Sequence, residues 1–167
     1  MGGADWYVLH TRTTREMEVS RRVKQAGITA LVPRRQMVER RRGLRRIVVR
    51  NLFPGYVFVY TALDAKAYCQ LAGIPYVIRI LGHGAPQPVT PEEMNRVLRL
   101  AREDDLVGVS QILYENGRVR VLSGPLAGLE GQIVKLDRRK GRAKVNIPLF
   151  NQPRFVDLSV HVLEKSE

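Results

Sequence analysis

The first half of the chain alternates between strand-like and helix-like patterns of apolar residues. Residues 6–10 form an apolar and aromatic run, which predicts a buried strand because such side chains suit a pleated surface. A capping-box pattern from Thr13 to Glu16 predicts a helix start, and the apolar spacing extends that helix over residues 14–26. Gly27 then stands where a left-handed cap ends a helix.

The same patterns continue through the rest of this half. Asp64 and Thr90 are predicted helix caps, and Pro91 suits the first position of a helix. The strand at residues 56–60 places aromatic side chains on one face and valines on the other. The further predicted elements are strands at residues 28–32 and 76–81, a helix at 65–72, and a helix from 91 with Met94, Val97, Leu98 and Ala101 on its apolar face.

Between residues 34 and 50 the sequence has eight arginines in seventeen positions, with Gly43 near the middle and apolar residues on both sides. This pattern predicts a β-hairpin with a cationic tip, because glycine adopts the turn conformation while the two arms pair. Such arginines can protect a sheet edge from aggregation, meet an acidic protein surface or bind phosphates. Their number exceeds what edge protection requires, so we favour phosphate contact.

From residue 111 onward the helical periodicity is absent. Short strands broken by Gly, Pro and Asn are spaced as in a small all-β barrel. These strands are predicted at residues 118–122, 132–136, 143–147 and 155–158. We therefore predict a mixed α and β domain at residues 1–104, a linker at 105–113 and a barrel domain at 114–167.

Charge changes this picture more than overall composition does. The chain has 28 Lys and Arg against 16 Asp and Glu, a formal net charge of +12 and a pI near 10.5. Residues 1–104 hold 18 basic and 9 acidic residues, and residues 105–167 hold 10 and 7. Such an excess favours polyanionic partners, and Arg, which outnumbers Lys, suits phosphates and guanine edges. We expect contact with nucleic acid.

Cysteine usage and hydropathy exclude several classes of protein. The single cysteine, Cys69, excludes an internal disulfide and the common zinc-ligand spacings, and it is expected to be a buried thiol in a helix. A reducing cytoplasm fits this usage. No segment is apolar and long enough to cross a bilayer, and no secretory signal starts the chain, so we expect no membrane contact.

The residue types that carry catalysis do not assemble. His10, His83 and His161 are scattered along the chain, and the Glu92–Glu93 pair is explained by the favourable charge at a helix start. No phosphate-binding loop or dinucleotide fingerprint is present. We predict that the protein is not an enzyme, with no catalytic residues, metal or cofactor.

Aromatic side chains gather in two of the predicted strands. On composition alone such residues are most often core. Two strands that donate aromatics to one sheet also leave room for an exposed apolar patch, which marks a partner surface. Both readings stay open for Trp6, Tyr7, Tyr56, Phe58 and Tyr60.

Two groups of residues in this order resemble a known family. Trp6-Tyr7-Val8, Val32-Pro33 and residues 53–59 resemble the N-terminal (NGN) domain of NusG-family transcription elongation factors. Residues 119–131, with Phe150 and residues 155–158 behind them, are similar to a KOW domain. The resemblance covers nearly the whole chain. It implies an α+β fold, with a ferredoxin-like or RRM-like NGN domain followed by a small SH3-like β-barrel.

The resemblance also implies roles for the NGN residues. In this family the NGN domain docks an apolar depression onto the clamp helices of RNA polymerase and favours the processive enzyme. Carried onto this chain, the polymerase-binding residues would be Tyr7, Phe53, Tyr56 and Phe58. Contact with upstream DNA would fall to Arg40, Arg41, Arg42, Arg45, Arg46, Arg79 and His83.

The KOW part departs from the housekeeping pattern. In housekeeping members this domain binds a ribosomal protein or the termination factor Rho, and Phe150 matches the aromatic position used there. Here Leu126 replaces the usual Phe after Gly-Pro, and residues 149–154 replace a Phe-Gly-Arg turn. With the arginine-rich hairpin, these departures resemble the LoaP group, which antiterminates long biosynthetic operons and reads a leader RNA hairpin through its KOW domain.

An RNA-binding face of that kind would be built from basic residues of the predicted barrel. The turn at residues 138–142 is equally compatible with a solubilising surface turn. The residues are Arg118, Arg120, Arg138, Arg139, Lys140, Arg142, Lys144 and Arg154.

We therefore predict a monomeric, cytoplasmic, processive antitermination factor that binds RNA polymerase and a leader RNA hairpin. One alternative is a general NusG that couples polymerase to the ribosome or to Rho. Another is a ribosomal or RNA-assembly protein, since KOW modules occur there too. The Phe53-Pro54-Gly55-Tyr56 element disfavours the latter.

Overall fold

The computed structural model describes residues 3–101 and 105–164. The chain forms two compact units, one of residues 1–32 and 53–94 and the other of residues 33–52 and 95–167. Within the described ranges, no helix has the length and apolar character needed to cross a membrane. The predicted domain boundary at residue 104 lies outside the described residues and stays a prediction.

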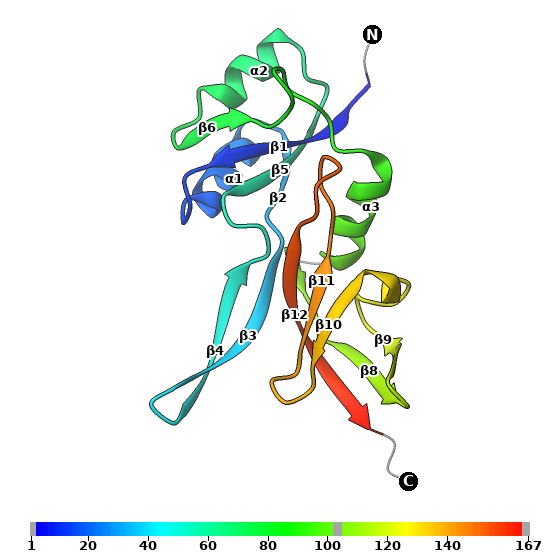
Figure 1. The fold of residues 1–167 in the computed structure, drawn as a ribbon. Helices are drawn as coiled ribbons and strands as arrows, with labels where there is room; N and C mark the ends of the chain where they lie inside the picture. Colours follow the sequence, from blue (N-terminus) through cyan, green and yellow to red (C-terminus); the bar gives the residue numbers. More distant parts are fainter. Residues whose placement is uncertain (1–2, 102–104, 165–167) are drawn as a thin grey trace. The chain divides into compact units, whose positions relative to one another are not determined.

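The first unit is built on a four-stranded antiparallel sheet with the order β2-β5-β1-β6 (Figure 1). Taken along the chain, its elements follow the β-α-β-β-α-β order of the ferredoxin-like fold, which confirms the predicted fold class. They are β1 (Asp5–Thr11), α1 (Glu16–Gln25), β2 (Thr29–Leu31), β5 (Tyr56–Thr61), α2 (Ala65–Ala72) and β6 (Val77–Ile80).

Helices α1 and α2 share one core with a single face of this sheet. Val19 and Val23 of α1 pack with Leu71 of α2 against Val57 and Val59 of β5, and all five side chains are fully buried. The predicted division of β5 is therefore confirmed, because its valines face the helices and its aromatic residues alternate to the other side.

Two of the three predicted helix starts are confirmed. The Asp64 carboxylate accepts the backbone N–H of Ala67 at 2.8 Å, and the Thr90 hydroxyl accepts that of Glu93 at 3.3 Å, at the start of α3 (Pro91–Leu100). The capping box at the start of α1 is wrong, because the cap residue is Arg15 and no side chain caps it.

Individual side chains on the helices also differ from the prediction. Cys69 is exposed on α2 rather than buried. Met17 and Leu98 are 44% and 38% exposed, whereas Leu100, which the apolar pattern left out, is 1% exposed. Helical spacing gives the direction of an apolar stripe, but its edges depend on which neighbouring elements cover it.

The arginine-rich segment forms the predicted hairpin. Strands β3 (Arg34–Arg41) and β4 (Leu44–Asn51) pair along their full length, from Arg34 opposite Asn51 to Arg41 opposite Leu44. The two turn residues, Arg42 and Gly43, have φ values of 53° and 78°. Positive φ at both positions gives the turn whose twist matches that of the paired strands.

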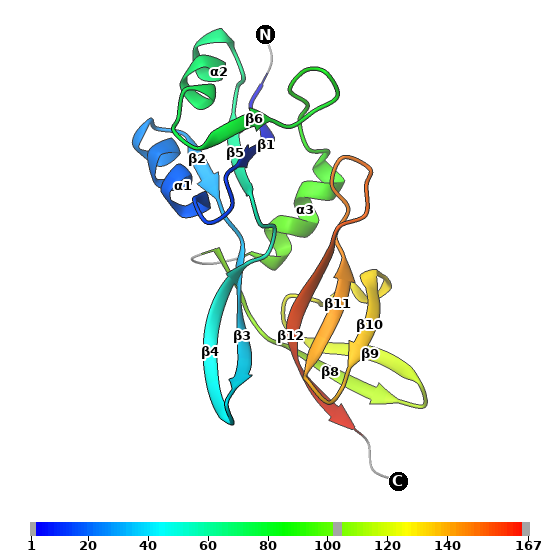
Figure 2. The same cartoon turned by 60° about the vertical axis from the view of Figure 1, so that its left-hand side comes forward.

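The second unit also contains a five-stranded sheet with the order β10-β11-β12-β8-β9, which curls into a barrel (Figure 2). One long strand, β12, pairs antiparallel with β11 through its first half and parallel with β8 through its second half. The predicted strands are confirmed, and two further ones, β7 and β8, were not expected. The elements are β7 (Leu106–Val107), β8 (Ser110–Glu115), β9 (Arg118–Ser123), the 3-10 turn η2 (Glu130–Gln132), β10 (Ile133–Asp137), β11 (Arg142–Asn146) and β12 (Phe155–Glu164).

A tight turn after β9 packs against the start of β8. Gly124 has a φ of 101°, and a Cβ at this position would lie 2.6 Å from the Cα of Ser110. The Ser110 hydroxyl accepts the backbone N–H of Leu126 at 2.9 Å. Leu126 and Leu149 are almost fully buried, so the leucine that departs from the housekeeping pattern is a core residue of the barrel.

Candidate protein and nucleic-acid interfaces

The turn before β5 is held in place from two sides. Gly55 has a φ of 83°, and the Tyr56 N–H donates to the Phe53 carbonyl at 3.1 Å, as expected where proline and glycine occupy the centre of a turn. The Gly55 carbonyl accepts the backbone N–H of Thr11 at 2.8 Å. Its N–H donates to the buried carboxylate of Glu16 at 3.0 Å. The start of β5 is thereby fixed against β1 and α1.

The face of the sheet opposite this helix-covered core carries aromatic residues. Strand register places Trp6 opposite Tyr60, Val8 opposite Phe58 and His10 opposite Tyr56. We call these six residues the aromatic face. The Trp6 and Tyr60 rings lie 5.3 Å apart, the His10 and Tyr56 rings meet edge to face at 6.2 Å, and Val8 and Phe58 are fully buried between the two pairs.

The structure divides the four residues predicted to bind polymerase. Phe53 and Phe58 are buried, and their rings meet edge to face at 5.6 Å. Tyr7 lies on the opposite side of the sheet, opposite Val59, and packs against the helix-covered core. Burial, and then the nearby charge of Asp5, raises the pKa of Tyr7. Of the four predicted residues, only Tyr56 is both partly exposed and on the aromatic face.

Four members of the aromatic face were not predicted as site residues, namely buried Val8 and three residues with rings. His10 contributes a ring beside Tyr56, and Trp6 and Tyr60 form the pair at the far end, where Tyr60 is 44% exposed. Alternation within β1 was the signal that separates these positions from Tyr7. Using it required the pairing register of β1 with β5, which the sequence does not state.

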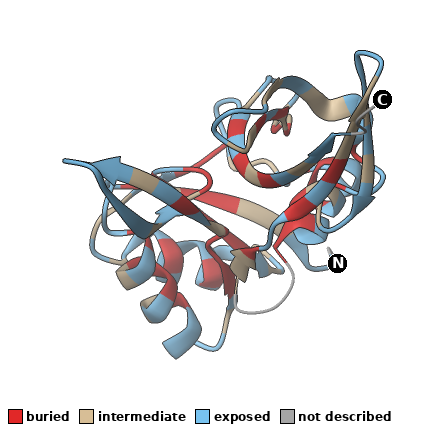
Figure 3. Ribbon diagram, turned by 90° about the horizontal axis from the view of Figure 1, so that it is seen from below, coloured by how far each residue is buried: buried red, intermediate tan, exposed pale blue. Residues whose placement is uncertain are grey.

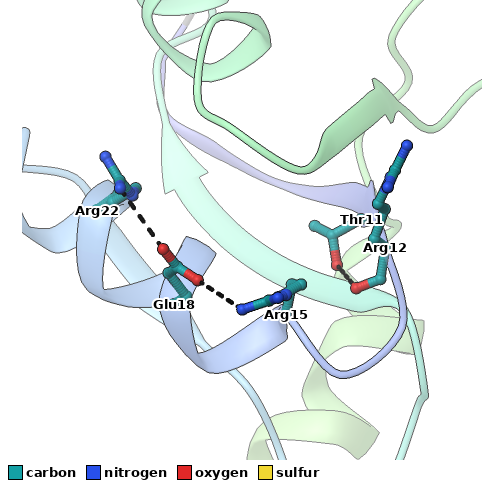
Figure 4. Close-up of polar contacts among 5 residues, drawn as sticks. All are labelled: Thr11, Arg12, Arg15, Glu18 and Arg22. Carbon is teal, nitrogen blue, oxygen red and sulfur yellow. Dashed lines mark hydrogen bonds and ion pairs between the residues drawn. The ribbon is translucent and has the colours of Figure 1, made fainter.

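Basic residues on α1 are engaged with an acid of the same helix. Glu18 lies between Arg15 and Arg22, with ion-pair distances of 3.4 and 3.5 Å (Figure 4). The guanidinium of Arg15 also lies over the ring of Tyr76, at 4.7 Å from its centroid. Exposed pairs of this kind contribute little to stability, and they reduce the free positive charge of this surface.

The predicted DNA-binding residues of the hairpin fall on two faces. Arg40 lies opposite Arg45 in the strand register, on one face. Arg46 lies opposite Glu39 on the other face, which also includes Arg41. All five predicted arginines, including Arg42 in the turn, are exposed, as the pale blue outer part of the hairpin shows (Figure 3). The remaining two predicted residues, Arg79 on β6 and His83 in the following loop, are exposed in the first unit.

The edge of β3 is contacted by the barrel strands of its own unit. The Ser159 hydroxyl donates to the Gln36 carbonyl at 2.7 Å, and Arg142 donates to the Val38 carbonyl at 3.1 Å. Burial lowers the pKa of Arg35, which the Asp157 charge opposes in part. Arg142, predicted to bind RNA, is therefore occupied by a backbone carbonyl in this conformation.

The predicted RNA-binding residues of the barrel form two groups. In the first group, Arg138 of the β10–β11 turn lies over the ring of Tyr114 on β8 at 4.2 Å and forms an ion pair with Glu164 on β12 at 2.9 Å. Asp137 accepts the backbone N–H of Lys140 at 2.9 Å, and this bond holds the pKa of Asp137 below its usual value. The group comprises Arg118, Arg120, Arg138, Arg139 and Lys140, all of them exposed.

The second group lies toward the other end of β11. The Lys144 ammonium lies 5.2 Å from the centre of the Phe155 ring, which is 53% exposed. The backbone N–H of Arg154 donates to the side chain of Asn146 at 3.0 Å. Phe155 was not predicted as a site residue, although its alternation with buried Val156 and Leu158 places it outside the barrel.

Phe150 occupies a strained turn. Phe150 and Asn151 have φ values of 53° and 60°, and the flanking Leu149 and Gln152 exchange two backbone hydrogen bonds of 3.0 Å. Left-handed backbone is unusual for a bulky residue, and such strain often accompanies a functional position. The turn presents a half-buried aromatic ring at the place where the sequence predicted a partner contact.

Metal ligation has no geometric support within residues 3–101 and 105–164, where no group of three or more His, Cys, Asp or Glu residues is suited to hold an ion. The arrangement described above presents rings and cations on two modules, which suits binding of macromolecules.

Comparison with known proteins agrees with this architecture. Residues 4–98 match the family model described as NusG, transcription termination factor nusG, and residues 115–146 match the KOW motif. The chain is 32% identical to the transcription termination/antitermination protein NusG of Pseudomonas aeruginosa over 172 residues, covering 96% of this chain and 97% of that protein. It is 29% identical to the protein of the same name from Thermus thermophilus, covering 97% and 98%.

A solved structure also matches. The structure described as domain interaction in Thermotoga maritima NusG superposes with a TM-score of 0.56 at 27% identity, covering 94% of each chain. Both modules of that family are thus present here, in the same order and over nearly the whole chain. This chain belongs to the NusG family of transcription termination and antitermination factors.

Proposed function

We propose that this protein is a specialised, LoaP-like antitermination factor, which binds RNA polymerase through the aromatic face and a leader RNA hairpin through the barrel. One observation carries the RNA part of the proposal. Arg138 connects the β10–β11 turn to the β8–β9 hairpin through Tyr114, and both of these segments carry exposed cations. A folded RNA presents phosphates at several positions at once, which such a group can match.

The local geometry of this end supports an RNA-binding role. Asp137 fixes the turn by accepting the Lys140 N–H, so the turn is ordered before any ligand arrives. Arg138, in the same turn, contacts the Tyr114 ring and forms an ion pair with Glu164. The two cations of the turn that would contact phosphates are therefore Arg139 and Lys140. Preorganised groups lose less entropy on binding, so a fixed turn favours selective recognition over loose electrostatic attraction.

The aromatic face supports the polymerase part of the proposal. Tyr56 and His10 form a partly exposed ring pair, and the rings of Phe53 and Phe58 are buried and meet each other edge to face. Because the turn at Gly55 is fixed to β1 and α1, these rings keep their position. We propose Tyr56 and His10 as direct contacts and the two phenylalanines as their support. A ligand that binds elongating polymerase better than paused polymerase shifts the population toward elongation.

The RNA part is tested by selection and affinity. The full chain is incubated with a pool of leader transcripts from its source genome, and retained RNA is sequenced and measured by fluorescence anisotropy. We expect one hairpin to be enriched and to bind about tenfold or more tightly than its scrambled sequence, the difference of at least one good base contact. Replacing Arg139 and Lys140 by Gln should weaken binding to this hairpin about tenfold or more, because two phosphate contacts are lost.

A matched double variant controls for loss of charge. Arg21→Gln with Lys24→Gln on α1 removes the same charge from a surface outside the barrel and should keep the affinity for the hairpin. Retention of many unrelated RNAs with equal affinity would show that the barrel does not read a hairpin, and would favour the general NusG alternative.

The polymerase part is tested by capture of the enzyme. Tyr56→Ala should abolish retention of RNA polymerase on the immobilised full chain, while its circular dichroism spectrum stays native. Tyr68→Ala is the control, because Tyr68 is an exposed tyrosine on α2, at 46%, outside the aromatic face. Equal capture by the Tyr56 variant and the unmodified chain contradicts the proposed contact.

A second candidate function is that of a general NusG. The strained turn at Phe150 favours it, since the family resemblance assigns this position to contacts with a ribosomal protein or Rho. In that case Phe150→Ala should lose binding to one of those two proteins, whereas Phe155→Ala should keep it. For the antitermination proposal, neither protein binds and Phe150→Ala leaves RNA affinity unchanged. Family membership does not support the ribosomal alternative.

A further inference from the structure

The outer side of strands β11 and β12 carries one exposed ring among polar side chains. Strand register places Asn146 opposite Phe155 and Lys144 opposite Asp157, and these four residues alternate with residues buried inside the barrel. Phe155 is 53% exposed, and the Lys144 ammonium lies 5.2 Å from the centre of its ring. We call Lys144, Asn146, Arg154 and Phe155 the ring site.

Phe155 is the most accessible of the three aromatic residues in the barrel. The ring of Tyr114 is covered by an arginine, and Phe150 is half-buried in a turn with left-handed backbone. Phe155 instead belongs to a paired strand, and the Asn146 side chain holds the neighbouring backbone by accepting the Arg154 N–H at 3.0 Å. A ring on a fixed strand loses little conformational freedom when a ligand covers it, which suits a binding platform.

The charges beside the ring indicate what kind of ligand fits. Lys135 lies opposite Lys144, which lies opposite Asp157, so the row next to Phe155 carries two ammonium groups and one carboxylate. An apolar protein surface would bury these ammonium groups without a counter-charge, which is costly. Each unpaired nucleotide of RNA supplies both a phosphate for an ammonium group and a flat base for the ring.

We propose that Phe155 stacks against an unpaired base of the RNA, and that Lys144 contacts a phosphate beside it. The inference rests on the proposed RNA-binding role of the barrel and names the part of the RNA that is recognised. Asn146 and Phe155 lie at the end of β11 remote from the β10–β11 turn, about 13 Å along the strand by the rise of four residues. One hairpin can therefore place stem phosphates on Arg139 and Lys140 and a loop base on Phe155. Bases within the stem are already stacked on each other, so the ring selects the loop.

Substitutions at Phe155 separate stacking from other contributions. Phe155→Tyr keeps an aromatic ring, Phe155→Leu keeps apolar bulk without a ring, and Phe155→Ala removes both. Leu122→Ala is the control, because Leu122 is an exposed aliphatic residue on β9 of the same barrel, at 43%. Thermal melts followed by circular dichroism establish that each variant of the full chain folds as the unmodified chain does.

Affinity is measured by fluorescence anisotropy with a single-stranded RNA of mixed sequence, about 12 nucleotides long, and with a blunt RNA duplex that has no unpaired base. Phe155→Ala and Phe155→Leu should bind the single strand about fivefold or more weakly, the effect of losing one stacked base, and Phe155→Tyr and Leu122→Ala less than about twofold. Affinity for the duplex should stay unchanged in all four. The slope of log affinity against log salt should stay the same for Phe155→Ala, and Lys144→Gln should make it shallower by about 0.7.

Tryptophan fluorescence reports the stacking itself. Phe155→Trp places an indole at the ring site, and a base that stacks on an indole quenches its emission. Single-stranded RNA should therefore quench the emission of the Phe155→Trp variant. The unmodified chain, whose single tryptophan is Trp6 in the other unit, should change little.

Several outcomes would overturn the proposal. Full affinity of Phe155→Ala for the single strand would remove the site, full affinity of Phe155→Leu would mean apolar contact without stacking, and absence of quenching would exclude a stacked base. Intact RNA affinity of Phe155→Ala with loss of binding to a ribosomal protein or Rho would assign the ring to a protein contact. The selection from leader transcripts distinguishes this inference from the proposed function. An enriched hairpin that Phe155→Ala binds fully removes only the stacking site, whereas stacking of single strands without any enriched hairpin removes only the specific leader.

Discussion

The Glu16 carboxylate connects the first helix to the turn that begins β5. It is 1% exposed and accepts the Gly55 N–H at 3.0 Å. A buried carboxylate is tolerated only where hydrogen bonds replace its lost hydration, and this one receives a bond from a turn glycine whose φ is 83°. The residue thereby determines where Tyr56, the next residue after the turn, is presented.

Replacing Glu16 by Ala tests this role. The Gly55 N–H would lose its acceptor in a buried place, so we expect the free energy of unfolding to fall by about 1–3 kcal/mol in urea titrations. Glu18→Ala is the control on the same helix, since its pairs with Arg15 and Arg22 are partly exposed, and it should cost less than about 1 kcal/mol. If the two variants lose the same free energy of unfolding, the proposed role of the Glu16–Gly55 hydrogen bond is wrong.

The sequence predicted residue types at this scale better than it predicted their contacts. It placed Glu16 at a helix start but assigned it to a capping box with Thr13. The Gly55 N–H that Glu16 accepts is 39 residues away, so no local pattern in the sequence reveals this bond. It grouped Tyr7 with Tyr56, although the two lie on opposite sides of the sheet. Contacts of this kind depend on register between strands that are far apart along the chain.

At the scale of elements, the turn after β9 depends on one glycine. Gly124 combines a φ of 101° with a close approach to Ser110, whereas Gly131 has open space around its Cβ direction and no positive φ. Both glycines belong to the segment that resembles a KOW motif. Only Gly124 is required by the backbone geometry, whereas the space around Gly131 would accept a side chain.

Gly124→Ala should therefore destabilise the barrel strongly. A methyl group 2.6 Å from a backbone carbon forces the strands apart, and the left-handed backbone adds strain, so we expect a loss of about 2 kcal/mol or more. Gly131→Ala should change stability by less than about 0.5 kcal/mol. The measurement is urea unfolding of the full chain; a mild Gly124 variant would show that the turn relaxes at little cost.

Elements were predicted well wherever a local pattern specifies them. The hairpin needed only a central glycine between two arms that can pair, and the structure confirms both strands and places Gly43 in the turn. Strand β8 is an exception, because it was missed although it pairs antiparallel with β9 across Asn116 and Gly117, two residues with positive φ that suit a hairpin turn. The first helix was placed correctly, but the exposure of Met17 was not.

For the whole molecule, the proposed contact with RNA predicts how binding depends on salt. Neutralising about five phosphates of an RNA hairpin predicts a slope of log affinity against log salt of about −3.5 to −4.5. The double replacement of Arg139 and Lys140 by Gln should make the slope shallower by about 1.4 to 1.8, one unit of phosphate contact for each lost cation. The measurement is anisotropy across a salt series, and an unchanged slope contradicts the assignment of this turn.

Strand β12 has a consequence for how the protein is made. It supplies both seams of the barrel, pairing with β11 from Phe155 to Ser159 and with β8 from Val160 to Glu164. Every other barrel strand leaves the ribosome before it, and synthesis proceeds at about 5–20 residues per second. The ferredoxin-like sheet has all its strands by Ile80. A nascent chain thus completes its ferredoxin-like sheet several seconds before the module proposed to read RNA can close.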